Sequence, residues 1–272
     1  MSFDLIRFLP IILLLFSGLV YSEPSNQTIA ENTRITHLAG GSDYFPRLLK
    51  LALEKTKTTH GNYEIKVKPW IATKQRMRKI LAENEYFNLL WSTYSEAREK
   101  ELLPVKVDLL KGLNQHRILL IHPNTQSQFD HVRSIKDLSA FTAISGAFWQ
   151  DSIILKRNQL PVLLAPDLDK TIRMFNLKRA DYFPRGVYEI WQELTRPEFA
   201  NFELEKNLLL KYEAAYYFFV SYKNRALADR LTLELKLAQQ DGSFDELFFS
   251  YPEFAKGWDS VVNNQRRVIY LN

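Results

Sequence analysis

Apolar residues follow two different periods in the first third of the chain. Residues 34–39 are interpreted as a first strand, residues 87–91 are a mostly apolar run of strand length, and residues 63–70 alternate apolar with charged side chains, which is typical of a half-buried strand. Apolar residues at helical spacing predict a helix over 44–57 and another that begins after Thr73. Strands that alternate with helices in this way predict a sheet of parallel type with helices on both faces.

A second series of the same kind begins after residue 134. It consists of a short helix over 135–138, strands over 141–145, 161–165 and 180–183, and helices over 149–157, from Asp167 or Asp169 to Leu177, and over 187–195. The apolar run from Ala214 to Tyr222 then predicts a buried strand, and a helix over 224–240 ends at Asp241-Gly242. The chain shows no fixed-period repeat and no low-complexity linker, so the second lobe is expected to interrupt the first.

The N-terminal residues have the pattern of an export signal. Arg7 precedes an apolar core from Leu9 to Val20, and Val20-Tyr21-Ser22 predicts cleavage before Glu23. An uncleaved membrane anchor is the alternative interpretation of this core. The sequence therefore predicts a periplasmic protein. Its expected parts are a signal peptide over 1–22, a first lobe over 23–112 plus 216–272, and a second lobe over 113–215.

Composition excludes several classes of site. The chain has no cysteine, so it can have no disulfide, no thiolate metal site, no cysteine nucleophile and no acylated lipoprotein anchor. Its residues are 46% hydrophobic and 13% aromatic, enough to build a core without disulfides. The net charge of +5 comes from 36 basic and 31 acidic residues spread along the chain. This small excess argues against nucleic acid as a partner and permits a mild preference for anions.

Small hydroxyl residues and an arginine follow the third predicted strand. Ser92, Thr93 and Ser95 come directly after the apolar run, and Arg98 follows in a charged, helical segment. The planar guanidinium can hold a carboxylate through two parallel hydrogen bonds. An ordinary strand, loop and helix would give the same pattern, so this stretch alone leaves both interpretations open.

Taken in order, these features resemble the periplasmic solute-binding proteins of the type II class, in particular the polar amino-acid receptors of ABC transporters. The resemblance covers most of the mature chain. It depends on the export signal, the early strand with its small-residue loop, the loop from Ser92 to Arg98, the mid-chain crossing and the late helix that ends in residues 237–244. It implies an α/β fold of two lobes, the type II periplasmic-binding-protein fold, each lobe a mixed sheet flanked by helices, with the ligand cleft between them.

The resemblance also implies roles for residues. In that family a hydroxyl residue and an arginine after the third strand hold the α-carboxylate of the ligand, and Thr93 and Arg98 match those places. The second lobe contributes a helix start, which here is 145–149. Where the family has an acid for the ligand's ammonium group, this chain has Arg185, which would attract a second anion. Glu189 would restore the acid if it points inward.

Aromatic residues at strand ends and loop starts could stack on a ligand, and core packing is the alternative for each of them. Trp91 is expected in the core. The expected ligand-binding residues are Tyr44, Trp70, Ser92, Thr93, Arg98, Ser145, Gly146, Trp149, Tyr182 and Arg185.

A hydrolase is the competing class, because Glu189 and Glu193 lie four residues apart on one predicted helix. Glycosidase carboxylates must flank a bond from separate elements, and the chain has no nucleophile elbow, no His-Glu-x-x-His site and no glycine-rich phosphate loop. The five histidines lack the spacing of metal ligands. The sequence therefore predicts a protein that is not an enzyme.

The expected function is capture of a small carboxylate-bearing solute, an amino acid or a related anion, by lobe closure and its presentation to a membrane permease or receptor. A ligand-sensing module for a membrane signalling protein is the second interpretation. The expected partners are an anionic or zwitterionic small molecule and a permease or sensor protein. We expect a monomer without nucleic acid, metal or cofactor.

Overall fold

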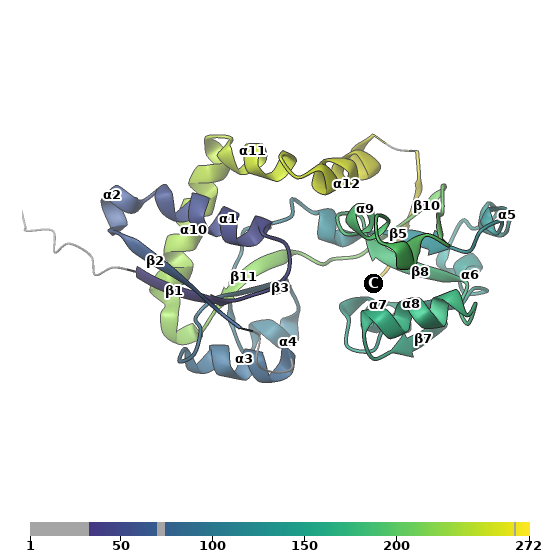
Figure 1. Cartoon of the computed structure of the whole chain (residues 1–272), viewed down its shortest axis with the longest axis horizontal. Coiled ribbons are helices and arrows are strands. Elements are labelled where there is room, and N and C mark those ends of the chain that lie inside the picture. The colour runs from purple at the N-terminus through teal and green to yellow at the C-terminus, as the bar shows by residue number, and fades with distance from the viewer. Residues whose placement is uncertain (1–32, 70–73, 264) are drawn as a thin grey trace, which may run out of the picture.

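The computed structural model describes residues 33–69, 74–263 and 265–272. Over these residues the chain forms two lobes that lie side by side, each with its own strands and helices (Figure 1). The expected export signal and Trp70 lie outside the described residues. In the part of the chain that the structure describes, no helix is long and apolar enough to cross a membrane.

The first lobe contains two small sheets. β1 (Thr33–Leu38) and β2 (Tyr63–Lys68) pair in parallel. β3 (Leu90–Thr93), β11 (Tyr216–Val220) and β4 (Leu103–Val105) form an antiparallel sheet with β11 in the middle. β11 is therefore a strand from late in the chain that completes a lobe begun at its start.

One side chain links these two sheets, and helices cover them. Asn88, just before β3, accepts a hydrogen bond from the backbone N–H of Thr36 at 2.8 Å and donates one to the carbonyl of Arg34 at 2.7 Å. The helices of this lobe are α1 (Tyr44–Glu54), α2 (Lys57–His60), α3 (Lys74–Glu83), α4 (Glu96–Glu99), α10 (Arg225–Gln240) and α11 (Ser243–Phe249). α1 forms because its apolar residues recur at helical spacing and are buried against α10 and α11.

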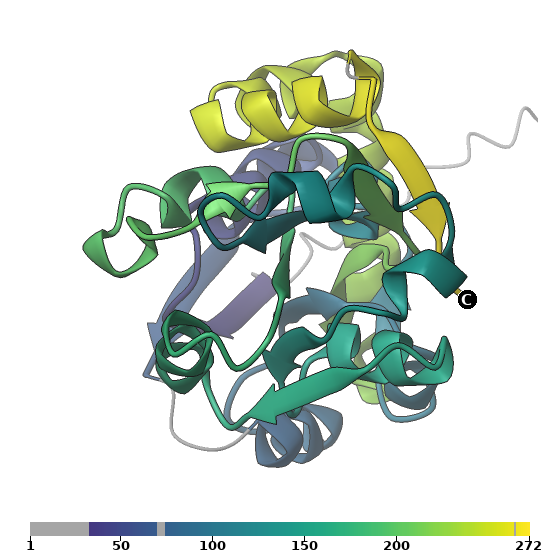
Figure 2. The same cartoon turned by 90° about the vertical axis from the view of Figure 1, so that its right-hand side faces the viewer.

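The second lobe is built on one seven-stranded mixed sheet with the order β12-β10-β5-β8-β6-β7, to which β9 adds on β5. Its strands are β5 (His116–Ile121), β6 (Ala143–Gly146), β7 (Val162–Ala165), β8 (Tyr182–Gly186), β9 (Glu203–Leu204), β10 (Leu208–Lys211) and β12 (Arg267–Tyr270). Its helices are α5 (Gln126–Phe129), α6 (Ile135–Leu138), α7 (Gln150–Arg157), α8 (Leu168–Asn176) and α9 (Ile190–Glu193), with the short 3-10 helix η1 (Leu113–Gln115) at its entrance and η2 (Pro197–Phe199) after α9. Figure 2 shows this lobe toward the viewer.

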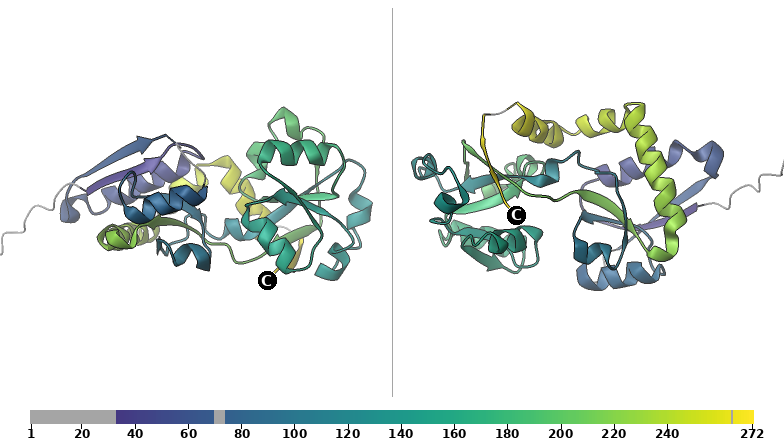
Figure 3. Two further views of the ribbon diagram at one scale, coloured as in Figure 1. Left: turned by 90° about the horizontal axis from the view of Figure 1, so that it is seen from below. Right: turned by 180° about the vertical axis from the view of Figure 1, so that it is seen from behind.

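The chain passes from one lobe to the other after β4, again between β10 and β11, and again along α11 and α12 (Pro252–Val262) into β12. The views from below and behind show these connections on one side of the two lobes (Figure 3). Gly257 on α12 lets this last connection pack closely, because a Cβ there would lie 2.7 Å from the carbonyl oxygen of Val187.

β12 departs from the predicted lobe boundary, which assigned residues 216–272 to the first lobe. β12 pairs in parallel with β10 and so belongs to the sheet of the second lobe. Ile269 and Leu271 are buried in the core of that lobe. The segment that forms β12 is too short for its sequence to indicate which sheet it joins. The remaining division of the chain into lobes stays a proposal.

Most predicted elements are present, with shifted ends. The helix over 224–240 is confirmed as α10, and the left-handed backbone of Gly242, with φ of 81°, follows it as expected. β3 begins at Leu90, later than the predicted run of 87–91, so Ser92 and Thr93 lie in the strand and not in a loop. β8 continues through Pro184, Arg185 and Gly186, where the sequence predicted its end.

Candidate functional site

A pocket of about 490 Å³ lies at the ends of β1 and β3 in the first lobe. Its lining residues come from the end of β1 and the loop after it, from α3, β3, α4 and β11. They are Leu38, Ala39, Gly40, Gly41, Met77, Arg78, Leu90, Trp91, Ser92, Arg98 and Tyr216. Ligands of open α/β sheets bind beyond the carboxyl ends of the strands, and the volume suits a small solute.

Arg98 is held in this pocket by its own local structure. Ser95 caps α4 and accepts the backbone N–H of Arg98 at 3.3 Å. The Nη1 of Arg98 donates to the carbonyl oxygen of Thr93, and the guanidinium lies 5.6 Å from the ring centroid of Phe219. Burial, and after it the positive charge of Arg78, lower the pKa of Arg98 to about 10. Among the described residues no carboxylate forms an ion pair with it.

Stacked aromatic rings form one wall of the pocket. The ring of Phe45, on α1, lies between Trp91 and Tyr216, with centroid distances of 5.5 and 5.1 Å. Trp91 is half-buried and lines the pocket, so it is not confined to the core as the sequence suggested. The apolar part of a ligand could pack on these rings.

A buried asparagine connects the predicted hydroxyl residue to the second lobe. The Nδ2 of Asn114, in η1, donates to the Oγ1 of Thr93 at 3.2 Å and to the carbonyl of Ala214 at 2.5 Å. Its Oδ1 accepts the hydroxyl of Tyr188 at 3.2 Å. Thr93 therefore lies beside η1, where the chain enters the second lobe. Ser92, its neighbour in β3, lines the pocket.

In the second lobe, Arg185 is already neutralised. Its Nε and Nη2 donate to both carboxylate oxygens of Glu193, at 2.8 and 2.5 Å, and Nη2 lies 3.2 Å from Glu189. The guanidinium also lies 5.1 Å from the ring centroids of Trp149 and Phe183. The structure therefore does not support the expected role of Arg185 in binding a second anion. Two carboxylates and two aromatic rings already surround its guanidinium.

The helix start of the second lobe is only partly available. The ring of Trp149 covers Gly146, where an added Cβ would overlap the ring atoms. The backbone N–H groups of Ala147 and Trp149 donate to Ala165 and Gly146. The hydroxyl of Ser145 is buried and has no hydrogen-bond partner, so it is the polar group left unused at this strand end.

Two predicted aromatic residues belong to the core. Tyr44 is fully buried among aromatic rings, and its hydroxyl donates to the carbonyl of Leu109 at 2.7 Å. Tyr182 is fully buried against Phe129. Both lack a surface that a ligand could reach, so neither enters the proposed site.

The sequence interpretation missed several residues of this region. Arg78 lines the pocket, although basic neighbours in sequence are typical of a solvated helix face. Glu189 takes part in the Arg185 cluster, as its position relative to that arginine could have suggested. Arg117, on β5, forms an ion pair with Asp151, in the first turn of α7, at 2.6 Å. The described residues include no cluster of three or more His, Asp or Glu side chains that could hold a metal.

No protein-family model and no curated protein matches the sequence. Solved structures do match. The structure of a Bacillus subtilis protein described as a probable amino-acid ABC transporter extracellular-binding protein has a TM-score of 0.60 and 19% identity, over 81% of this chain and 98% of that one. An ancestral arginine-binding protein bound to glutamine has a TM-score of 0.58 and 13% identity, over 81% and 97%.

The chain has the type II periplasmic-binding-protein fold. This confirms the predicted two-lobe α/β architecture. A histidine kinase sensor domain with similarity to periplasmic binding proteins also shares the fold, with a TM-score of 0.56 and 10% identity over 82% of this chain and 96% of that one. At these identities the similarity establishes the fold, and the function has to be argued from the pocket.

Proposed function

We propose that the chain is a receptor that binds a small carboxylate-bearing solute in the pocket of the first lobe and closes the second lobe over it. The observation that carries this proposal is Arg98, which lines the pocket without a carboxylate partner among the described residues. An arginine that is partly desolvated and has no carboxylate partner can donate strongly to a ligand carboxylate, because ion pairing would offset its desolvation.

The two-lobe architecture supports the closing motion. Two lobes joined along one side can rotate about their connections, and a solute that binds better to the closed arrangement shifts the equilibrium toward it. Among proteins of this fold, one is bound to glutamine and another is described as an amino-acid ABC transporter binding protein. Their names support a receptor for small carboxylates.

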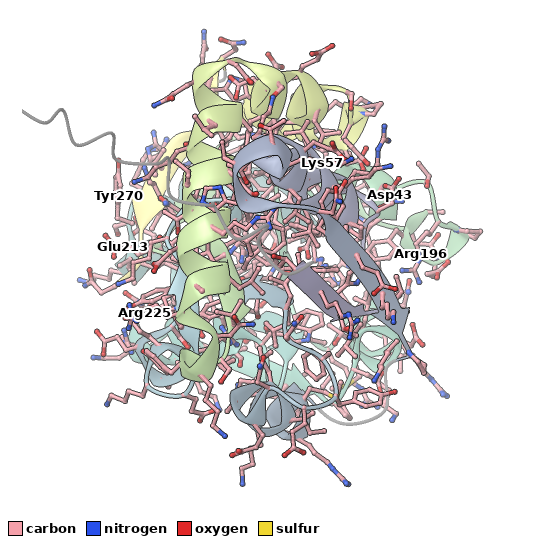
Figure 4. The ribbon with its side chains drawn as sticks, turned by 90° about the vertical axis from the view of Figure 1, so that its left-hand side faces the viewer. Asp43, Lys57, Arg196, Glu213, Arg225 and Tyr270 are labelled. Carbon is pink, nitrogen blue, oxygen red and sulfur yellow. The ribbon has the colours of Figure 1, made fainter. Side chains whose placement is uncertain are left out.

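Calorimetric titration of the protein with amino acids, dicarboxylates, short peptides and sugar acids tests the proposal. A solute that binds the native state should also raise the melting temperature. Arg98→Ala should weaken binding by about 2 to 5 kcal/mol, because it removes a desolvated charged partner. Arg225→Ala is the control, since Arg225 lies exposed at the start of α10, on the outside of the first lobe (Figure 4). An unchanged affinity in Arg98→Ala would exclude the pocket as the carboxylate site.

We further propose that the protein acts in the periplasm as a monomer, after cleavage near Ser22, and presents its solute to a membrane permease without changing it chemically. Mass spectrometry of the exported protein tests the cleavage site, and mass spectrometry of the recovered solute tests the absence of a reaction. Gel filtration with light scattering tests the monomer.

A sensing role is the second candidate, and the similarity to a histidine kinase sensor domain favours it. Cross-linking in membranes, with and without solute, distinguishes the two. Capture of transporter subunits supports delivery, whereas capture of a signalling receptor supports sensing.

A further inference from the structure

A second guanidinium lines the pocket that contains Arg98. Arg78 lies on α3, and its side chain is 29% exposed. Its Nε is buried and has no hydrogen-bond partner, although the Oε2 of Glu101 lies 3.4 Å away. A buried donor without an acceptor is costly, so this nitrogen is a place where a ligand oxygen would be favoured.

The charges around the pocket are unbalanced. The lining residues include two guanidinium groups, those of Arg78 and Arg98, and no carboxylate. Glu101 offsets part of the charge of Arg78, but it does not line the pocket and its own side chain is 47% exposed, so solvent screens the pair. Burial lowers the pKa of Arg98, and the positive charge of Arg78 lowers it further.

The acids of the second lobe do not compensate for this excess. Glu193 binds Arg185 through both oxygens, and Glu189 contacts the same guanidinium. These three side chains carry a net charge of one negative unit, shared within their own cluster. A ligand ammonium group would therefore find no acid among the residues that line the pocket of the first lobe.

We propose that the pocket binds a solute with two anionic groups, one held by Arg98 and the other by Arg78, with the connecting carbons packed on Trp91 and Tyr216. The solute class is a short dicarboxylate or a carboxylate with a second acidic group of similar size. The inference rests on the proposed function, since Arg98 holds the first carboxylate in both. It adds a second anion site on α3.

A matched pair of probes isolates the second charge. Glutarate and its monoamide, glutaramate, have the same length and nearly the same shape, but glutaramate carries one charge fewer. We expect the wild-type protein to bind glutarate at least about tenfold more tightly, because the second carboxylate gains a charge-assisted hydrogen bond. Arg78→Met should reduce this preference to less than about threefold. Arg98→Met should weaken binding of both probes.

Lys79→Met is the matched control, because Lys79 is an exposed residue on the same helix and does not line this pocket. It should keep the preference for glutarate. Melting curves and circular dichroism of each variant verify that it is folded. Titration with 3-phosphonopropionate distinguishes a second carboxylate from a phosphonate, and binding of either in an Arg78-dependent manner supports the second anion site.

Two results would overturn the inference: equal binding of glutarate and glutaramate by the wild-type protein, or a preference that Arg78→Met leaves unchanged. If zwitterionic amino acids bind in a way that depends on Arg98 and not on Arg78, the receptor function stands and the second anion site is excluded. If no solute binds in a way that depends on Arg98, the proposed function itself fails.

Discussion

The Nε of Arg117 lies 2.6 Å from the Oδ1 of Asp151, and both side chains are almost fully buried. The hydroxyl of Tyr212 donates to the same oxygen at 2.5 Å. Burial would raise the pKa of Asp151, but the charge of Arg117 and the hydroxyl of Tyr212 lower it below its usual value. The pair thus ties β5 to the first turn of α7, beside the chain segment that leaves the second lobe.

Asp151→Ala should lower the free energy of unfolding by about 3 to 5 kcal/mol, because it leaves the buried charge of Arg117 without its partner. Urea unfolding followed by circular dichroism measures the change. Glu83→Ala is the control, since it breaks an exposed ion pair with Lys223 and should change stability by less than about 1 kcal/mol. Equal effects of the two substitutions would contradict a structural role for the buried pair.

His116 should make stability depend on pH. Burial lowers its pKa from 6.5 to about 4. The unfolded chain therefore takes up a proton as the pH falls below about 6.5, whereas the folded chain does so only near pH 4. The free energy of unfolding should therefore decrease by about 3 kcal/mol as the pH falls from neutral through this window, because the unfolded chain binds the proton more tightly.

Urea unfolding at several pH values measures this dependence for the wild type and for His116→Gln. Glutamine has no titrating ring and can still donate to the carbonyl of Gly112, which lies 3.1 Å from the Nδ1 of His116. The variant should lose less stability between neutral pH and pH 4 than the wild type. Parallel curves for the two proteins would show that His116 does not cause the dependence.

Gly257→Ala should loosen the contact between α12 and the second lobe. The added Cβ would lie 2.7 Å from the carbonyl oxygen of Val187, and that oxygen belongs to the backbone and cannot rotate away. We expect a loss of about 1 to 3 kcal/mol in the free energy of unfolding. Ser260→Ala on the same helix should have little effect, because it removes only a hydroxyl whose hydrogen bond to the carbonyl of Lys256 is exposed to solvent. Hydrogen exchange should increase along α12 in Gly257→Ala, and unchanged exchange would argue against a tight contact.

Glu193 and Glu189 should contribute unequally to stability. Glu193 is 12% exposed and binds Arg185 through both oxygens, whereas Glu189 is 36% exposed and has one contact with Arg185, at 3.2 Å. Glu193→Ala should cost about 2 to 4 kcal/mol and Glu189→Ala less than about 1 kcal/mol, measured by thermal or urea unfolding. The opposite order would mean that Glu189 is the principal partner of Arg185.

The hydrophobic periods predicted most of the helices and strands, whereas the two-lobe fold was expected from the resemblance to type II periplasmic binding proteins. Long segments such as α10 have apolar residues at helical spacing, which predicts their secondary structure. The order of strands and helices then limits the possible topologies. Strand ends were less predictable, because Leu90 and Arg185 lie in strands whose limits depend on pairing with β11 and β5 from distant parts of the chain.

The candidate site was predictable only where local sequence sets the geometry. Ser95 caps α4 and places Arg98 three residues later, so the two could be recognised together. Arg78 is different, because its neighbours in sequence are also basic and only the folded structure separates the one that lines the pocket. Tyr44 was expected to bind the ligand because it lies at a helix start. Its hydroxyl instead donates to the carbonyl of Leu109, which is distant in sequence, so local sequence could not show this role.

β12 also has a consequence for biosynthesis. The other strands of the second sheet, from β5 to β10, are synthesised before β12. The free edge of β10 therefore stays unpaired until β11 and the helices α10 to α12 have also been synthesised. Until then, the apolar residues of β10 have an open backbone edge that another chain could pair with. A nascent or truncated chain without β12 would thus be prone to aggregate, and a chaperone that shields strand edges would be useful to it at that stage.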